Sequence, residues 1–473
     1  MADLLTAAIA ANRLGLGARP GDLEALAADP RGALRAQIAG TAPVLVANRL
    51  QDSATVLAQA AELRRERVTE KRAAPSADSG EFVVAVAAKL GALYRPIYLD
   101  ECVARLQAGV ASERSFIERM VHFWSNHFAV SVDKRIVMGV AGAFEREAIR
   151  PHVLGSFRDM LLAVEQHPAM LLYLDNFQSV GPGSDAARVV SRRAAIGGGG
   201  RKVGINENLA REILELHTLG ADGGYTQSDV TEFAKVITGW SMGGGRGRLR
   251  GGEPGRFYFR EALHEPGAKQ VVGKRYNQDG ASQGVAVLHD LARSPATAHH
   301  VATKLARHFI ADEPPAAAVD RLAHAFLKND GDLPALYRVL IDSPELWSEA
   351  AAKFKTPSDY IYSAHRALGA HSELGRSALQ SFELLGQRNF SPGSPAGWPD
   401  RSADWDGSSS VLKRVEWADQ LGQRFGNQVN AVVLAPQVLG SALTSATRTA
   451  IARAESAAQG LTLLLAAPEF MRR

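Results

Sequence analysis

Helical spacing of apolar residues is the feature that most constrains the fold of this chain. Alanine, leucine, arginine and glutamate dominate most long segments, and the apolar residues recur three or four positions apart. One range, 256–276, instead gathers Phe, Tyr and Val as a β-hairpin does. The sequence therefore predicts a mainly α-helical protein, a large multi-helix single domain over residues 1–473 with a small β-hairpin near 256–276.

Four stretches interrupt the helical pattern. They are rich in Gly, Pro, Ser or charged residues and cover 64–80, 180–204, 241–256 and 386–409. Long segments of this composition in a compact protein are either functional loops or disordered. We expect each of them to be a flexible insertion in one continuous domain.

Composition excludes several classes of protein. Hydrophobic residues make up 46% and charged residues 22%, and the formal net charge of +4 is spread along the chain, so no nucleic-acid partner is expected. A single cysteine, Cys102, rules out an intrachain disulfide. No window approaches a membrane-spanning length of apolar residues, and the first residues, MADLLTAAIAANRLGLG, carry no visible export signal. A cytoplasmic location is therefore favoured over an exported one.

The range 206–219 predicts a helix with one polar strip. The strip consists of Glu207, Asn208, Arg211, Glu212 and Glu215. Glu207, Arg211 and Glu215 fall within about 80° of one another on a helical wheel, and Asn208 and Glu212 extend this face to about 140°. His217 lies in the middle of the opposite, apolar face. A helix-capping pair, Thr226 and Asp229, opens the next helix after a tight turn.

A second helix, within 111–134, repeats this arrangement. His122 and Asn126 lie on one polar strip, whereas His127 falls among the aromatic residues of the other face. A third helix, over 296–309, is amphipathic, and we expect its histidines, His299, His300 and His308, to be divided between its faces.

If the first two helices face each other, their polar residues form one buried cluster of the kind in which catalytic groups are found. In this interpretation Glu207 and Glu212 act as acid/base groups or metal ligands. His122 carries a proton or ligates, Asn126 orients the substrate, and Arg211 holds an anionic group. The remaining polar residues of the strip, Asn208 and Glu215, would bind substrate.

A structural interpretation stays open beside the functional one. Glutamate and arginine four residues apart also form ordinary ion pairs on an exposed helix face, and a histidine on an apolar face is most simply a satisfied core residue. Metal-binding helices usually place ligands three or four residues apart, a spacing that Glu212 and Glu215 do not give with His217. A divalent metal is nevertheless the cofactor that the acidic strip leaves open.

Two tryptophans, Trp398 and Trp405, lie in the Pro/Gly-rich stretch that contains GWPD. Tryptophan rings in such a loop either stack on a sugar or anchor the loop against the protein. Both residues are candidate binding residues.

Several segments follow one another in an order that resembles a known family. They include NRLGLGARPGDL, RMVHFWSNHFAVS, HPAMLLYLDN, NENLAREILELHTLGADGGYTQSDVTEFAKVITGW, LHEPGAKQVVGK and FKTPSDYIYSAHRALGA. Together they resemble the bacterial domain-of-unknown-function family 1800 (DUF1800) over nearly the whole chain. The resemblance assigns no catalytic residue. It implies a possible partner protein, because members are often encoded beside a second family with a sulfatase-like look, and many members carry export signals.

Two functions are therefore left open by the sequence. The first is a hydrolase or transferase with a polar Glu/His/Asn/Arg site between two helices, metal-assisted or not, acting on a polar or anionic substrate. The second is a non-catalytic protein that binds or assembles with the product of a neighbouring gene.

Overall fold

The computed structural model describes residues 4–45, 47, 49–73, 79–195, 204–244, 251–349 and 353–473. Its helices are α1 (Leu4–Ile9), α2 (Asp22–Leu26), α3 (Pro30–Ile38), α4 (Ser53–Ala73), α5 (Ser79–Ala111), α6 (Ser115–His127), α7 (Ala141–Phe144), α8 (Phe157–Glu165), α9 (Pro168–Tyr173), α10 (Asp185–Ala195), α11 (Asn208–Glu212), α12 (Gln227–Val236), α13 (Ala281–Ala292), α14 (Pro295–Phe309), α15 (Ala316–Lys328), α16 (Leu333–Asp342), α17 (Pro357–Leu368), α18 (Gln380–Leu384), α19 (Ser408–Phe425), α20 (Ala431–Leu439), α21 (Ser445–Ala452), α22 (Ala457–Leu465) and α23 (Pro468–Met471). The prediction of a mainly α-helical, multi-helix domain is confirmed.

Two small antiparallel sheets complete the described part of the chain. Strand β1 (Trp240–Met242) pairs with β2 (Phe257–Phe259), and β3 (Lys269–Val271) pairs with β4 (Lys274–Tyr276). The hairpin predicted for 256–276 is therefore β3–β4, while β2 pairs with a strand upstream of that range. Positive φ angles at Val272 and Gly273 form the two-residue turn that fits the twist of a hairpin.

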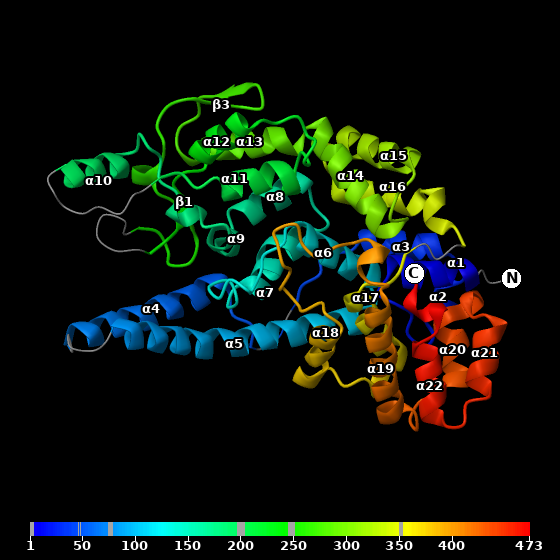
Figure 1. Cartoon of the computed structure of the whole chain (residues 1–473). Coiled ribbons are helices and arrows are strands. Elements are labelled where there is room, and N and C mark those ends of the chain that lie inside the picture. Colours follow the sequence, from blue (N-terminus) through cyan, green and yellow to red (C-terminus); the bar gives the residue numbers. More distant parts are fainter. Residues whose placement is uncertain are drawn as a thin grey trace.

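The helices form two large clusters of buried hydrophobic residues. One contains side chains of α6, α8, α13, α14 and α16, and the other contains side chains of α17 and α19–α22 together with α1. In Figure 1 the green helices α12–α16 lie above α6, while α19–α22, in orange and red, form a separate bundle below α1 and α2. Helix α6 belongs to the first cluster and α17 to the second, so the contact between these two helices lies where the clusters meet.

The four predicted loops differ in outcome. Helix α4 continues to Ala73 and α5 begins at Ser79, so most of 64–80 is helical, because its Arg and Glu residues are good helix formers. In Figure 1 these two helices extend together from the body. Helix α10 occupies part of 180–204. Strand β1 includes the first two residues of 241–256.

The stretch 386–409 is irregular from Gly386 to Gly407 apart from one 3-10 turn at Ser402–Asp404, and α19 begins at Ser408. Residues 74–78, 196–203 and 245–250 lie outside the described residues. The flexibility of all four stretches stays a prediction.

Candidate functional site

A cavity of about 450 Å³ lies where the two core clusters meet. Its walls come from α6, α14, the start of α17 and the irregular stretch between Gln387 and Asp404. Its charged lining side chains are Arg105, Arg119, Lys304, Arg307, Arg388, Arg401, Asp359, Asp400 and Asp404. The lining therefore carries twice as many arginine and lysine side chains as carboxylates, and histidines lie among them.

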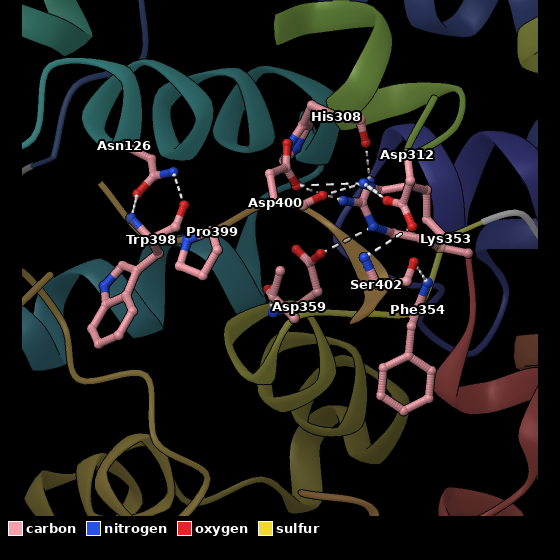
Figure 2. A network of polar contacts seen from close by, with 12 residues as sticks. Asn126, His308, Asp312, Lys353, Phe354, Asp359, Trp398, Pro399, Asp400 and Ser402 are labelled. Carbon is pink, nitrogen blue, oxygen red and sulfur yellow. Dashed lines mark hydrogen bonds and ion pairs between the residues drawn. The ribbon is translucent and has the colours of Figure 1, made fainter. Parts of the chain in front are cut away.

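Helix α6 supplies one wall through its polar strip. Arg119, His122 and Asn126 line the cavity at helical spacing, while Met120 and Trp124 on the other side are fully buried. Asn126 also holds the opposite loop, because its Nδ2 donates to the carbonyl of Trp398 at 2.9 Å and its Oδ1 accepts from the backbone N–H of Trp398 at 2.7 Å. Figure 2 shows this pair of bonds.

Helix α14 supplies the facing wall. Its cavity-lining residues recur every three or four positions and are His300, Thr303, Lys304, Arg307 and His308. Val301 and Leu305 on its other side are fully buried. The histidines of this helix divide as expected, since His299 is exposed whereas the other two line the cavity.

A carboxylate orients one of these histidines. His308 Nδ1 lies 2.9 Å from Asp400 Oδ2. Burial alone would raise the pKa of Asp400, but His308, Lys353 and Arg473 lower it to about 2. Asp400 is therefore ionised at neutral pH and accepts the hydrogen bond, so Nδ1 of His308 carries the proton.

The other nitrogen of His308 is left as an acceptor. Burial lowers the pKa of His308 to about 4, although Asp400 opposes this effect. At neutral pH the ring is therefore neutral, with a lone pair on Nε2. Nε2 is buried and has no hydrogen-bond partner among the described residues.

Four further buried polar atoms of lining residues also lack a partner among the described residues. They are His122 Nε2, Thr303 Oγ1, His127 Nδ1 and Arg119 Nε. Leaving a polar atom buried without a hydrogen bond costs roughly 1–3 kcal/mol, so such atoms are rare in folded proteins unless water or a ligand satisfies them. Five such atoms belong to residues that line one cavity, which makes it a candidate site for a ligand with hydrogen-bonding groups.

The cations of the cavity divide into paired and unpaired groups. Arg105 forms an ion pair with Glu145 at 2.7 Å, and Arg119 forms one with Asp359 at 3.0 Å. Burial would raise the pKa of Asp359, but Arg119 and Arg473 hold it well below its usual value. These two cations are therefore neutralised within the protein.

Lys304, Arg307 and Arg388 form no ion pair with a carboxylate of the described residues. Burial lowers the pKa of Lys304 to about 8, because loss of water disfavours the ammonium form more than Asp400 favours it. An anionic ligand would favour the charged form of this lysine.

The acidic strip of the sequence prediction lies elsewhere. Glu207 accepts hydrogen bonds from two residues of α12, Thr231 at 2.7 Å and Gln227 at 2.8 Å. It also forms an ion pair with Arg211 at 3.2 Å. Neither Glu207, Arg211 nor Glu212 lines the cavity. The structure therefore brings His122 and Asn126 together with α14 and not with α11, because α11 packs against α12. The catalytic roles suggested for the three α11 residues stay predictions.

The predicted binding residues also separate. Asn208 is exposed and Glu215 accepts a hydrogen bond from Tyr225, and neither lines the cavity. Trp398 lines it, and Trp405 packs beside Trp398 with ring centroids 6.1 Å apart. The indole of Trp405 donates to the carbonyl of Pro399 at 3.0 Å, so this residue anchors the loop.

Each of the two core-facing histidines uses one ring nitrogen in a hydrogen bond, while His217 Nε2 and His127 Nδ1 have no partner among the described residues. His217 is fully buried, with Nδ1 2.7 Å from Glu165 Oε1. His127 donates through Nε2 to the carbonyl of His217 at 3.1 Å. The capping box of Thr226 and Asp229 is confirmed.

Sequence reasoning missed Lys304, Arg307, His308 and Asp400 as site residues. The polar face of α14 repeats at positions 300, 303, 304, 307 and 308, and this spacing is visible in the sequence. Asp400 belongs to the segment GWPD, in which only Trp398 was predicted to bind a ligand. Nothing in the sequence indicates that this aspartate meets His308.

A divalent metal does not fit the described residues. Among them, no three His, Cys, Asp or Glu side chains are grouped so that they could ligate one ion. No chemistry is therefore assigned to a metal here. None of the described helices is both long enough and apolar enough to cross a membrane.

Comparison with known proteins gives one match. No curated protein and no solved structure matches the chain. The model of one family, described as "Protein of unknown function (DUF1800)", matches residues 9–472. That range contains every lining residue of the cavity and both core clusters except Ala7 and Ala8, and the chain belongs to the DUF1800 family.

Proposed function

We propose that this protein binds a small anionic substrate in the cavity between α6 and α14 and acts on it as a hydrolase or transferase. The observation that carries the proposal is the set of buried, unpartnered atoms, His122 Nε2, Thr303 Oγ1 and His308 Nε2, beside the half-buried cation Lys304. A ligand with an acid group and hydroxyl groups satisfies all four.

Binding of the anion rests on the cations without a carboxylate partner. Lys304 and Arg307 lie one turn apart on α14, and Arg388 reaches the cavity from the loop. Among partly buried side chains, a charge–charge contact is stronger than at an exposed surface. The acid group is therefore placed near Lys304, where it also raises the pKa of the lysine.

The proton transfer rests on His308. Its Nε2 takes a proton from a water molecule or from an acceptor hydroxyl, and the oxygen so activated forms a bond to the electrophilic atom of the substrate. The bond to the leaving group breaks with its electron pair, and the proton now on His308 passes to that group. Asp400 keeps the ring oriented and stabilises its protonated form, as the carboxylate does in a catalytic triad.

Binding of inorganic phosphate, sulfate and acetate, measured by calorimetry on the full chain, tests the first half of the proposal. Lys304→Met is expected to weaken anion binding about tenfold, whereas Lys328→Met, which removes an exposed lysine of α15, leaves it unchanged. Absence of binding to all three anions, or an equal effect of both variants, overturns the proposal.

Catalysis is tested separately. Release of 4-nitrophenol from its phosphate, sulfate and acetate esters is compared between the unchanged protein and His308→Gln. Turnover that His308→Gln lowers at least a hundredfold, with anion binding retained, supports the enzyme. Anion binding with no turnover of any ester, or turnover that the variant does not change, favours the alternative function, a non-catalytic binding protein.

A further inference from the structure

We infer that the ligand of this cavity is a sugar ring that carries an acid group. The inference rests on the proposed function, because it names the class of anion that the site takes. Three features of the lining carry it together: an aromatic ring, a set of neutral hydrogen-bonding atoms, and the unpaired cations.

Phe123, Phe144 and Phe390 also line the cavity, and the aromatic ring that we assign to the ligand is the indole of Trp398. It lines the cavity and is only partly buried, so part of the side chain is left for a ligand. In Figure 2 Trp398 and Asn126 lie on one side of Asp400, and Lys353 lies on the other. The indole and the His308–Asp400 pair are therefore at different places along the same cavity wall.

The position of Trp398 is fixed from two directions. The two hydrogen bonds of Asn126 hold its backbone, and the ring of Trp405 packs against its ring at a tilt of 52°. Gly397 precedes it with a φ of 83°, and a Cβ at that position would lie 2.3 Å from the carbonyl oxygen of Asn126. The backbone of Trp398 is therefore held close to α6, and its ring is held by Trp405.

The neutral polar atoms distinguish a sugar from a flat aromatic acid. His122 Nε2, Thr303 Oγ1 and His308 Nε2 come from two helices on facing walls and each lacks a partner among the described residues. A benzoate-like ligand would satisfy the cations and stack on the indole, but it has no hydroxyl groups for these atoms. A sugar ring has an apolar C–H face for the indole and hydroxyl groups around its edge.

The size and charge of the cavity agree with one acidic sugar unit. A volume of about 450 Å³ lies in the range of small-ligand pockets. Lys304 and Arg307 hold the acid group, whether it is a carboxylate, a phosphate or a sulfate. These three acid groups are the arms of the test and do not alter the ligand class.

Calorimetry on the full chain tests the inference with matched probes. The acidic sugars are glucuronate, glucose 6-phosphate and glucose 6-sulfate. Glucose supplies the ring without the charge, and inorganic phosphate and acetate supply the charge without the ring. At least one acidic sugar is expected to bind about tenfold or more tightly than both glucose and the corresponding bare anion.

Variants of Trp398 test whether the indole ring is the cause of the tighter binding of the acidic sugar. Trp398→Ala is expected to weaken binding of the acidic sugar about tenfold and to leave phosphate binding unchanged, whereas Trp398→Phe retains most of the affinity because it keeps a flat face. Tyr258→Ala removes a partly exposed aromatic residue outside the cavity and serves as the control. Circular dichroism and melting of each variant establish that it is folded.

The outcomes separate the two proposals. If phosphate binds through Lys304 but acidic sugars bind no better, or Trp398→Ala has no effect on them, the inference is overturned and the proposed function stands. If benzoate binds more tightly than every acidic sugar, the ligand is an aromatic acid and the inference is again overturned. If no anion of any kind binds, the proposed function fails as well.

Discussion

His308 and Asp400 are 92 residues apart in the chain, yet Nδ1 of the histidine lies 2.9 Å from Oδ2 of the aspartate. The histidine comes from the last turn of α14 and the aspartate from an irregular loop. Lys353 holds the loop in place, because its Nζ donates to the backbone carbonyl of Asp400 and to the carboxylate of Asp312. The pair fixes the tautomer of His308 and leaves Nε2, a buried atom without a partner among the described residues, as an acceptor.

Replacing Asp400 by asparagine is expected to change the tautomer of His308. The amide of Asn donates to Nδ1 when turned toward it, so the proton moves to Nε2 and the base is lost. The ¹⁵N chemical shifts of the histidine ring report this exchange directly, and turnover of any ester that the protein hydrolyses falls in parallel. Retention of the Nδ1–H tautomer in Asp400→Asn would contradict the assigned geometry.

The affinity for anions is expected to fall as the pH rises through about 8. Burial lowers the pKa of Lys304 to about 8, so its ammonium form is present below that pH and is lost above it. Asp400 and Arg307 act on Lys304 in opposite directions, and His300, with a pKa of about 4, is neutral throughout this window. Bound anion raises the pKa of the lysine and moves the midpoint upward.

Calorimetric titrations with inorganic phosphate between pH 6 and pH 10 measure this dependence. Because phosphate has its own ionisation near neutral pH, sulfate is titrated as a probe of constant charge. Lys304→Arg keeps its charge over the whole range and is expected to remove the decline above pH 8. An unchanged decline in that variant would assign the titration to another group.

Glu145 is expected to be essential for stability and not for ligand binding. Its carboxylate pairs with Arg105 at 2.7 Å and with Arg150 at 3.0 Å, and all three side chains are buried. Glu145→Gln leaves both guanidinium groups without this charge, so the free energy of unfolding is expected to fall by about 3 kcal/mol. Urea unfolding measures the loss.

The pH dependence of this effect follows from the pKa of Glu145. Burial would raise that pKa, but Arg105 and Arg150 lower it below the ordinary value. A depressed pKa contributes stability above the unfolded value of about 4.3, and the contribution is lost as the pH falls through the folded value. The difference between the unchanged protein and Glu145→Gln is therefore expected to shrink below about pH 4.

Glu207→Gln is expected to have a small effect, which makes it the matched comparison for Glu145→Gln. The Glu207 side chain is 30% exposed and its hydrogen bonds to Thr231 and Gln227 are at the surface. The amide keeps some of them, so the free energy of unfolding is expected to change by less than about 1 kcal/mol. Loss of catalysis in this variant would place Glu207 in a working site after all.

Asn126→Ala is expected to release the loop at Trp398. The substitution removes both hydrogen bonds between Asn126 and the loop backbone, whereas the core-facing side of α6 is unchanged. Amide hydrogen exchange of residues 397–400 is expected to accelerate about tenfold or more, since each bond contributes roughly 1 kcal/mol. Exchange that stays as slow as in the unchanged protein would show that Trp405 alone holds the loop.

Local patterns in the sequence predicted most of the helices and the faces that they bury, although most of 64–80, where we expected a loop, is helical. The polar strip of His122 and Asn126, the core position of His217 and the cap of Thr226 and Asp229 all follow from local periodicity and local hydrogen bonding. These features depend on residues within a few turns of one another. These features can therefore be predicted from the sequence without the tertiary structure.

Only the tertiary structure decided which helices meet. The polar strip of α6 faces α14 and not α11, and Asp400 reaches His308 from a loop whose path no periodicity describes. The cause is physical. A helix presents several faces of similar polarity, and its neighbour is chosen by packing of the whole core between distant segments, so the candidate site formed by Lys304, His308 and Asp400 appears only when the chain is folded.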